Sequence, residues 1–166
     1  MTVFSMSLRG LLLIGAIAAA AWPGIAAALQ LGEGWTLAGN GRDAAIDVPA
    51  VFGTRVAPIA GISSNVVSVW KWDAIGERWA FFTPSMDALE LASYAETRGF
   101  SVLGTISPGD GFWINMSTAT ALDLSTGQIF VPNQWAFVLG WNLIATGTNV
   151  TAPQFLTSIE PYAAAS

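Results

Sequence analysis

Hydrophobic and polar residues alternate most regularly over residues 66–83. Because successive side chains of a β-strand point to opposite faces, this alternation predicts a β-hairpin. Its first arm is expected to place on one face Val66, Ser68, Trp70 and Trp72, and on the other face Val67, Val69, Lys71 and Asp73. A type I turn closed by Gly76 in the left-handed conformation is predicted to lead into a second arm over residues 78–83. The hairpin therefore carries three of the eight tryptophans of the chain, Trp70, Trp72 and Trp79.

The tryptophan-bearing face of this hairpin has two interpretations. Large aromatic side chains are mostly buried in proteins, so the face can form the core of a small sheet. Trp70, Trp72 and Trp79 can instead form an exposed platform for a sugar or another flat ligand. We favour the core, because the chain has few other large residues to fill one.

Before the hairpin, the pattern predicts one strand and one short helix. The strand covers residues 29–38 and ends at a polar turn. Asp47 precedes an apolar segment that contains Pro49, which is the order expected for an N-cap residue and a proline in the first helical turn. Gly53 is expected to end this helix, and residues 54–65 are expected to form a loop.

After the hairpin, apolar residues recur at the spacing of a helix. Met86, Leu89 and Ala92 fall on one helical face, which predicts an amphipathic helix over residues 86–98 that packs on a sheet. Ser85 is its expected N-cap, and Gly99 is its expected end.

Strand patterns fill most of the remaining chain. They cover residues 100–106, 112–116, 119–124 and 128–131. Pro108 and Gly109 suit a type II turn between the first two. Together the elements predict an α+β fold of predominantly antiparallel β-structure, a small sandwich or barrel-like sheet, with one main helix near residues 86–98.

The first 28 residues differ in composition from the rest of the chain. Arg9 is the only charged residue before Glu33, and residues 11–21 form an apolar run followed by a Pro-Gly pair and by small residues that end at Ala28. This order is typical of a secretory signal peptide cleaved after Ala28, which predicts a secreted or periplasmic protein with no stable membrane span after cleavage. The alternative is an N-terminal membrane anchor, since uncharged residues 10–32 are numerous enough to span a bilayer.

A partial repeat occurs near the C-terminus. Residues 140–147, Gly-Trp-Asn-Leu-Ile-Ala-Thr-Gly, echo residues 34–41, Gly-Trp-Thr-Leu-Ala-Gly-Asn-Gly, and Thr151 takes the capping position that Asp47 has in the first copy. We therefore divide the chain into a signal peptide (1–28), a β-rich module (29–133) and a C-terminal part (134–166). The C-terminal part is either the opening of a second, incomplete repeat, or a closing strand plus a short helix.

Five segments carry a resemblance to a known type of module. They are residues 34–37 (Gly-Trp-Thr-Leu), 69–73 (Val-Trp-Lys-Trp-Asp), 79–84 (Trp-Ala-Phe-Phe-Thr-Pro), 98–100 (Arg-Gly-Phe) and 108–115 (Pro-Gly-Asp-Gly-Phe-Trp-Ile-Asn). Over about residues 30–150 the chain resembles a β-rich module found, often in tandem, in exported proteins of environmental Gram-negative bacteria. That module has no settled biochemical activity, so the resemblance implies export and a modular architecture, and it implies no catalytic residue.

Charge and composition narrow the range of partners and cofactors. Six basic and eleven acidic residues give a net charge of −5, and no basic cluster occurs, so a nucleic-acid backbone would be repelled. The absence of cysteine and histidine excludes Ser-His-Asp and Cys-His catalysis, disulfides and zinc sites of the usual composition. We expect no cofactor and no metal site.

Carboxylates are the remaining candidates for catalysis. Asp73 with Glu77, or Asp87 with Glu90, are pairs of the kind that glycoside hydrolases use. Turns and helix starts favour acidic residues by themselves, so we expect structural roles and no enzymatic activity. A calcium site at Asp110 is not expected, because one carboxylate falls short of the roughly six to eight oxygen ligands that calcium takes.

These observations predict a non-enzymatic structural or interaction module at the cell exterior, with an extracellular protein or a polysaccharide as its partner. One alternative is a carbohydrate-binding module that uses Trp70, Trp72 and Trp79. Another is a glycoside hydrolase that works with carboxylates alone.

Overall fold

The computed structural model describes residues 28–124, 126–131, 135 and 137–163. Of the predicted leader, residues 1–27 lie outside this part of the chain. The elements in chain order are β1 (Leu29–Leu31), β2 (Gly34–Gly39), β3 (Ile46–Asp47), α1 (Val48–Phe52), β4 (Val66–Asp73), β5 (Arg78–Phe82), α2 (Ala88–Arg98), β6 (Ser101–Val102), β7 (Thr105–Ile106), β8 (Gly111–Met116), β9 (Thr120–Leu122) and α3 (Ala152–Ala163). None of the helices in this described part combines the length and the hydropathy that a membrane span requires.

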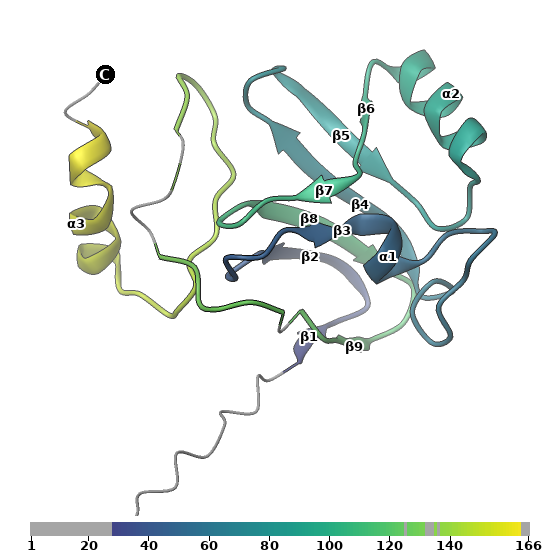
Figure 1. Ribbon diagram of the computed structural model, residues 1–166, viewed down its shortest axis with the longest axis horizontal. Helices are drawn as coiled ribbons and strands as arrows, with labels where there is room; N and C mark the ends of the chain where they lie inside the picture. Colours follow the sequence, from purple (N-terminus) through teal and green to yellow (C-terminus); the bar gives the residue numbers. More distant parts are fainter. Residues whose placement is uncertain (1–27, 125, 132–134, 136, 164–166) are drawn as a thin grey trace, which may run out of the picture.

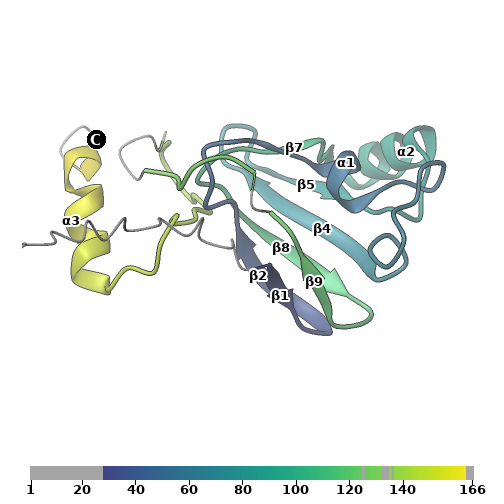
Figure 2. The same ribbon diagram turned by 60° about the horizontal axis from the view of Figure 1, so that its bottom comes forward.

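A five-stranded sheet forms the centre of the fold (Figure 1). Its strand order is β2-β8-β4-β5-β6, and neighbouring strands are antiparallel except β5 and β6. Two small sheets, β1–β9 and β3–β7, accompany it. Figure 2 shows β2, β8, β4 and β5 side by side, with α3 well away from them. The fold is therefore α+β and mostly antiparallel, as the sequence predicts.

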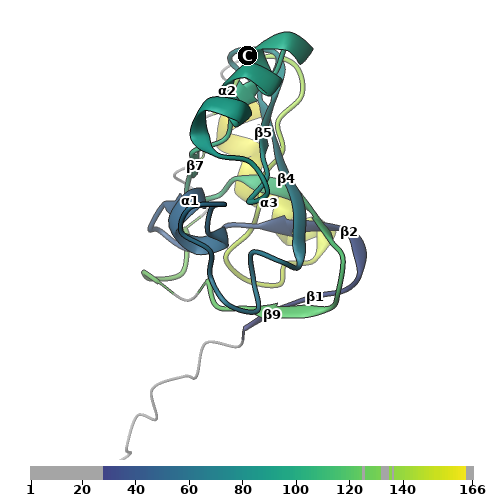
Figure 3. The same cartoon turned by 90° about the vertical axis from the view of Figure 1, so that its right-hand side faces the viewer.

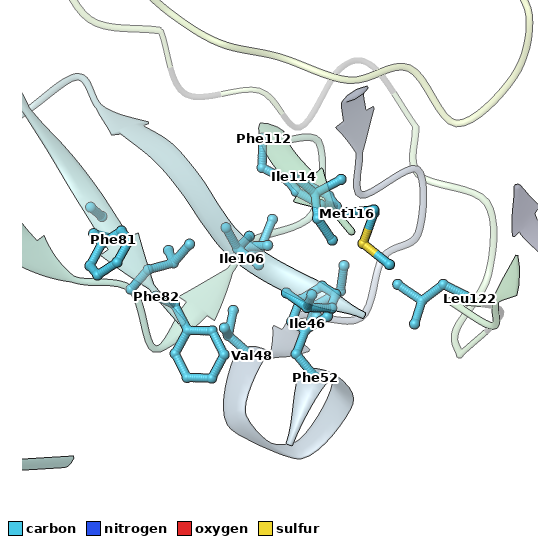
Figure 4. Close-up of a cluster of buried hydrophobic side chains, with 14 of the residues drawn as sticks. Ile46, Val48, Phe52, Phe81, Phe82, Ile106, Phe112, Ile114, Met116 and Leu122 are labelled. Atoms are coloured by element: carbon cyan, nitrogen blue, oxygen red, sulfur yellow. The ribbon is translucent and has the colours of Figure 1, made fainter. Parts of the chain in front are cut away.

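One face of the five-stranded sheet forms the hydrophobic core. Its buried side chains are Val69 of β4, Phe82 of β5, and Phe112, Ile114 and Met116 of β8. The elements α1, β3 and β7 cover this face (Figure 3) and contribute Ile46, Val48, Phe52 and Ile106 to the same cluster (Figure 4). The rings of Phe52 and Phe82 lie 6.5 Å apart, centre to centre, across this contact. We call this side the core face.

A β-bulge divides the first arm of the hairpin. Val66 pairs with the core residue Met116 of β8, whereas Ser68, two residues later in β4, pairs with Asn115, the residue adjacent to Met116. Val67 is therefore an extra residue, and the alternation of side chains changes there. As a result Val66 is buried in the core, while Ser68 points to the opposite face together with the tryptophans of β4. The prediction that Val66 shares a face with those tryptophans is wrong.

The turn between β4 and β5 also differs from the prediction. Asp73 pairs with Arg78, so residues 74–77 form the connection. The Asp73 side chain accepts hydrogen bonds from the backbone N–H groups of residues 75 and 76, at 3.2 and 3.1 Å. The residue with positive φ is Glu77 (+48°), not Gly76, so the predicted left-handed glycine is wrong. The Asp73 carboxylate stabilises the first part of the turn, and the left-handed residue is Glu77, one position after the predicted Gly76.

The main helix begins later than predicted. Asp87, and not Ser85, is the N-cap of α2: its carboxylate accepts a hydrogen bond from the Glu90 N–H at 2.9 Å, and the Glu90 carboxylate accepts one from the Asp87 N–H at 3.1 Å. This reciprocal capping box satisfies two backbone donors, which Ser85 at its position does not. Gly99, with φ of +75°, ends the helix as predicted.

Most of the other local predictions hold, some with shifted boundaries, and one predicted strand does not form. Asp47 caps α1 by accepting a hydrogen bond from the Ala50 N–H at 3.0 Å. Gly109 has a φ of +77°, as a type II turn requires. The strands predicted at 29–38 and 100–106 are each split into two short strands, β1 and β2, and β6 and β7. The pattern at 128–131 gives an isolated bridge to Arg42 in place of a strand.

Candidate functional site

The second face of the five-stranded sheet is aromatic. Strand pairing places Trp113 of β8 between Leu37 of β2 and Trp70 of β4, and it places Trp72 of β4 opposite Trp79 of β5. We define the aromatic face as Trp35, Trp70, Trp72, Trp79 and Trp113 together with Phe100, which precedes β6. The sheet thus presents large aromatic side chains on the side opposite Phe112 and Ile114. On this side Phe81, which pairs with Trp70, is buried, and its ring centre lies 5.2 Å from that of Tyr94 of α2.

These rings are accessible to solvent. Trp35 is 57% exposed and Trp79 is 36% exposed, while Trp70, Trp72 and Trp113 are half-buried. Large aromatic side chains are usually inside proteins, and contiguous apolar surface of this kind marks interaction sites more often than not. The aromatic face is therefore the strongest candidate for a binding surface in the described part of the chain.

An open hollow of about 530 Å³ lies in the aromatic face. The residues that line it are Trp35, Trp70, Trp79, Phe100 and Trp113. Four of them come from β2, β8, β4 and β5, and Phe100 directly precedes β6, so the hollow runs across the strands. Neighbouring strands lie about 4.8 Å apart, so crossing the sheet corresponds to roughly 19 Å. A hollow of this shape suits an extended ligand.

The rings of this hollow stand at steep angles to one another. Trp70 meets Phe100 at 84° with ring centres 4.9 Å apart, and it meets Trp79 at 81° with centres 6.4 Å apart. Edge-to-face contacts of this type are favourable for aromatic pairs. They give the hollow walls and a floor, in contrast to the coplanar rings of a flat platform.

Polar groups on this face are few and partly unused. Trp70 donates its indole N–H to the Ser68 hydroxyl at 3.0 Å. Among the described residues, the indole N–H groups of Trp35, Trp79 and Trp113 have no hydrogen-bond acceptor, and the side-chain amide of Asn115, which lies opposite Trp35 in the β2–β8 pair, makes no hydrogen bond either. No charged side chain of the described residues lines the hollow. The face therefore offers apolar rings and neutral hydrogen-bonding groups.

A second, smaller hollow adjoins the first. Its volume is about 240 Å³, and its lining residues are Trp72, Trp79, Trp141, Asn142 and Leu143. Trp79 is common to both hollows. The Trp72 indole N–H donates a hydrogen bond to the backbone carbonyl of Trp141 at 2.9 Å, which ties this part of the C-terminal segment to β4.

Two glycines allow the C-terminal segment to cross the end of the aromatic face. Gly39 of β2 and Gly111 of β8 lie opposite each other. A Cβ on Gly111 would lie 2.9 Å from Cγ of Leu143, and one on Gly39 would collide with Ala145. Backbone hydrogen bonds from the Gly111 N–H to the Leu143 carbonyl, at 2.9 Å, and from the Ala145 N–H to residue 109, at 2.7 Å, hold the segment there. The second copy of the repeat therefore packs against the end of the first.

The tryptophans singled out in the sequence lie together on the aromatic face. Trp70 and Trp79 line the larger hollow, and Trp72 contacts Trp79 with ring centres 5.5 Å apart at 68°. Sequence reasoning missed Trp35 and Trp113. Alternation in β8 places Trp113 on the side opposite Phe112, Ile114 and Met116, but it does not show which other residues share that side; the pairing of β8 with β4 brings Trp113 beside Trp70.

Three of the four candidate catalytic carboxylates, Asp73, Asp87 and Glu90, have structural partners. Asp73 stabilises the β4–β5 turn, and Asp87 and Glu90 form the capping box of α2. Both of the latter also pair with Arg55, at 2.6 and 2.7 Å. The Asp110 carboxylate pairs with the Lys71 ammonium at 2.6 Å. Within the described residues, no group of three or more acidic, histidine or cysteine side chains is placed to hold a metal ion.

Relatives of known function give no guide to this site. Comparisons of the chain with known protein families, with curated proteins and with solved structures found no match. The residues of the aromatic face themselves are therefore the basis for assigning a function.

Proposed function

We propose that the protein is a non-enzymatic binding module at the cell exterior that holds an uncharged carbohydrate chain across its aromatic face. The observation that carries this proposal is the open hollow lined by Trp35, Trp70, Trp79, Phe100 and Trp113, on the side of the sheet opposite Val69, Phe82 and Ile114. Sugar rings have apolar C–H faces that pack on aromatic rings, and the hydroxyl groups at their rims require hydrogen-bonding partners. The aromatic face offers both kinds of contact.

The charge of the site favours an uncharged ligand. No charged side chain of the described residues lines either hollow. The whole chain carries a net charge of −5, which disfavours acidic polysaccharides through like-charge repulsion. Neutral indole N–H groups and the Asn115 amide suit hydroxyl groups, which both donate and accept hydrogen bonds.

The ring geometry favours a single chain over a flat crystalline surface. A flat surface needs several coplanar rings to contact it at once. Trp70 is nearly perpendicular to both Phe100 and Trp79. A chain that lies in the hollow can contact such rings one after another, whereas a flat surface would touch only their edges.

A proline-rich polypeptide is a second candidate ligand. Proline-rich segments form extended helices that dock in aromatic-lined grooves. Proline has no N–H, so such a segment presents carbonyl acceptors to the free indole N–H groups of Trp35, Trp79 and Trp113. A proline-rich ligand would make the protein an interaction module with a protein partner, which is one of the two kinds of partner expected from the sequence.

Affinity electrophoresis of the full chain in gels containing soluble polysaccharides tests the proposal. Neutral β-glucan, xylan and galactomannan are compared with the acidic polygalacturonate. We expect at least one neutral polysaccharide to retard the protein and the acidic one to leave its migration unchanged. Trp79→Ala should abolish the retardation, because it removes a wall of both hollows. Leu37→Ala is the matched control, because Leu37 is exposed on the same face and lines neither hollow.

Two outcomes would contradict carbohydrate binding. Retardation that persists in the Trp79→Ala variant would place the site elsewhere. If no neutral polysaccharide retards the protein, while a proline-rich peptide shifts its tryptophan fluorescence, the polypeptide ligand is the correct one.

Export and the absence of enzymatic activity are separate parts of the proposal. Intact-mass measurement of the exported protein should give a chain that begins at or near Leu29, and a mass that retains residues 1–28 would favour the membrane anchor. A panel of aryl glycosides should show no hydrolysis. Hydrolysis that disappears in the Asp73→Asn or Glu77→Gln variant would show that the protein is a glycoside hydrolase.

A further inference from the structure

The two hollows of the aromatic face adjoin each other and share one lining residue. Trp79 lines both, and its ring lies between Trp70, 6.4 Å away, and Trp72, 5.5 Å away, centre to centre. Both contacts are steep, at 81° and 68°, and Trp79 is the residue that the two adjoining spaces share. The larger space lies across the strands, and the smaller one lies towards the β4–β5 turn and the C-terminal segment.

Trp141 forms the outer wall of the smaller hollow. Its backbone is fixed, because its carbonyl accepts the hydrogen bond from Trp72 and because the neighbouring Leu143 carbonyl accepts one from Gly111. Its side chain, in contrast, is 85% exposed. A large aromatic side chain with an anchored backbone and a free ring is well placed to contact a ligand at little cost in ordering the protein.

The repeat places equivalent tryptophans at the two ends of the combined site. Trp141 occupies in the second copy the position that Trp35 has in the first. Trp35 lines the larger hollow at the β2 edge, and Trp141 lines the smaller hollow beyond Trp79. Between these two tryptophans lie Trp113, Trp70, Trp79 and Trp72. The aromatic surface is therefore longer than either hollow by itself.

We infer that the protein recognises successive units along a neutral oligosaccharide chain, with an inner subsite in the larger hollow and an outer subsite formed by Trp72, Trp79 and Trp141. This inference rests on the proposed function. A short oligosaccharide fills the inner subsite alone, whereas a longer one also reaches Trp141. Affinity therefore increases with chain length, and the increase depends on Trp141.

Titration of the full chain with oligosaccharide ladders tests this inference. The ladders are β-1,4-glucan, β-1,4-xylan and β-1,4-mannan oligosaccharides, from the disaccharide to the hexasaccharide, and binding is measured by calorimetry. In the wild type we expect the dissociation constant to fall about tenfold between the trisaccharide and the hexasaccharide of the ladder that binds. Trp141→Ala should remove this gain while leaving the affinity for the trisaccharide unchanged. Trp79→Ala should weaken the binding of every length.

Leu139→Ala is the matched control for Trp141→Ala. Leu139 is 86% exposed and lies two positions away in the same segment, but it lines neither hollow. We expect this variant to keep the full dependence on length. Affinity that does not change with length, or a gain that survives in the Trp141→Ala variant, would overturn the two-subsite inference and leave carbohydrate binding intact. If no ladder binds the wild type, the proposed function fails together with the inference.

Discussion

The two faces of the central sheet are formed by the same strands but differ in burial. On the core face, Phe112 and Ile114 are fully buried beneath α1, β3 and β7. On the aromatic face, the neighbouring position in the strand holds Trp113, which stays half-buried, and Trp35 is more than half exposed. Both faces are strongly apolar. The difference shows that the layer packed on a sheet, and not hydrophobicity alone, decides which face becomes the core.

The largest effect is expected from Phe112→Ala on the core face. Phe112 is fully buried, and truncation of a core phenylalanine costs about 3 to 5 kcal/mol through lost burial and the cavity that remains. A domain of this size has about 5 to 15 kcal/mol in total, so the midpoint of urea denaturation should fall sharply. Trp113→Ala is the control on the next residue, and it should cost clearly less. Equal losses would mean that the aromatic face is a second core.

A smaller loss of stability, about 1 to 3 kcal/mol, is expected for Trp79→Ala. Trp79 is partly exposed but has ring contacts with Trp70 and Trp72, each worth about 0.5 to 1.5 kcal/mol in aromatic pairs. The variant should therefore remain folded at room temperature, with a near-native far-UV circular dichroism spectrum, while ligand binding disappears. Loss of the native spectrum would show that Trp79 is needed for the fold itself.

A third prediction concerns the ion pair of Lys71 at the end of the core face. It lies on the same side of β4 as Val69, but its ammonium pairs with the Asp110 carboxylate at 2.6 Å. Lys71→Ala should cost about 1 kcal/mol, and added salt should reduce the difference from the wild type, because salt screens the pair. Lys71→Met keeps most of the apolar stem, so comparison of the two variants separates charge from packing. A loss that is the same at low and high salt would exclude the ion pair as its cause.

The smallest change in stability is expected for Trp35→Ala. Trp35 is 57% exposed on the edge strand β2, and substitutions at such surface positions stay within about 0.5 kcal/mol. Its loss should nevertheless weaken ligand binding, because Trp35 lines the larger hollow. Leu37→Ala, at a similar exposure on the same strand, should affect neither stability nor binding. A large drop in the denaturation midpoint for Trp35→Ala alone would remove the contrast between the two faces.

Local elements of the fold could be predicted from the sequence because their causes are local. The Asp47 cap, the Gly99 end of α2 and the Gly109 turn each depend on a few adjacent residues. The start of α2 was misplaced because Ser85 and Asp87 are both suitable caps, and the partner Glu90 decides between them. The strands predicted over residues 29–38 and 100–106 are each interrupted in the structure, because an apolar pattern alone does not show where strand pairing stops.

The candidate site was only partly predictable, because its formation depends on strand order. The hairpin tryptophans Trp70, Trp72 and Trp79 were identified from alternation within one segment. Trp113 joins them only when β8 pairs with β4, and Trp35 only when β2 pairs with β8. The side on which they lie depends further on where α1 and β7 pack. These are contacts between segments far apart in the sequence, and single-segment patterns carry no information about them.

The extra residue Val67 sets the phase of the whole central strand. Val66 is an even number of residues from Trp70 and Trp72, so without the bulge a regular strand would place all three side chains on one face. If all three faced the core, two indoles would compete for space with Phe82 and Ile114. If all three faced the other way, Val66 would leave the hydrophobic core. Deletion of Val67 would place Val66 directly before Ser68, and regular alternation would then keep Val66 in the core and the tryptophans on the aromatic face without a bulge. The bulge at Val67 therefore reconciles this even spacing with positions on opposite faces of the sheet.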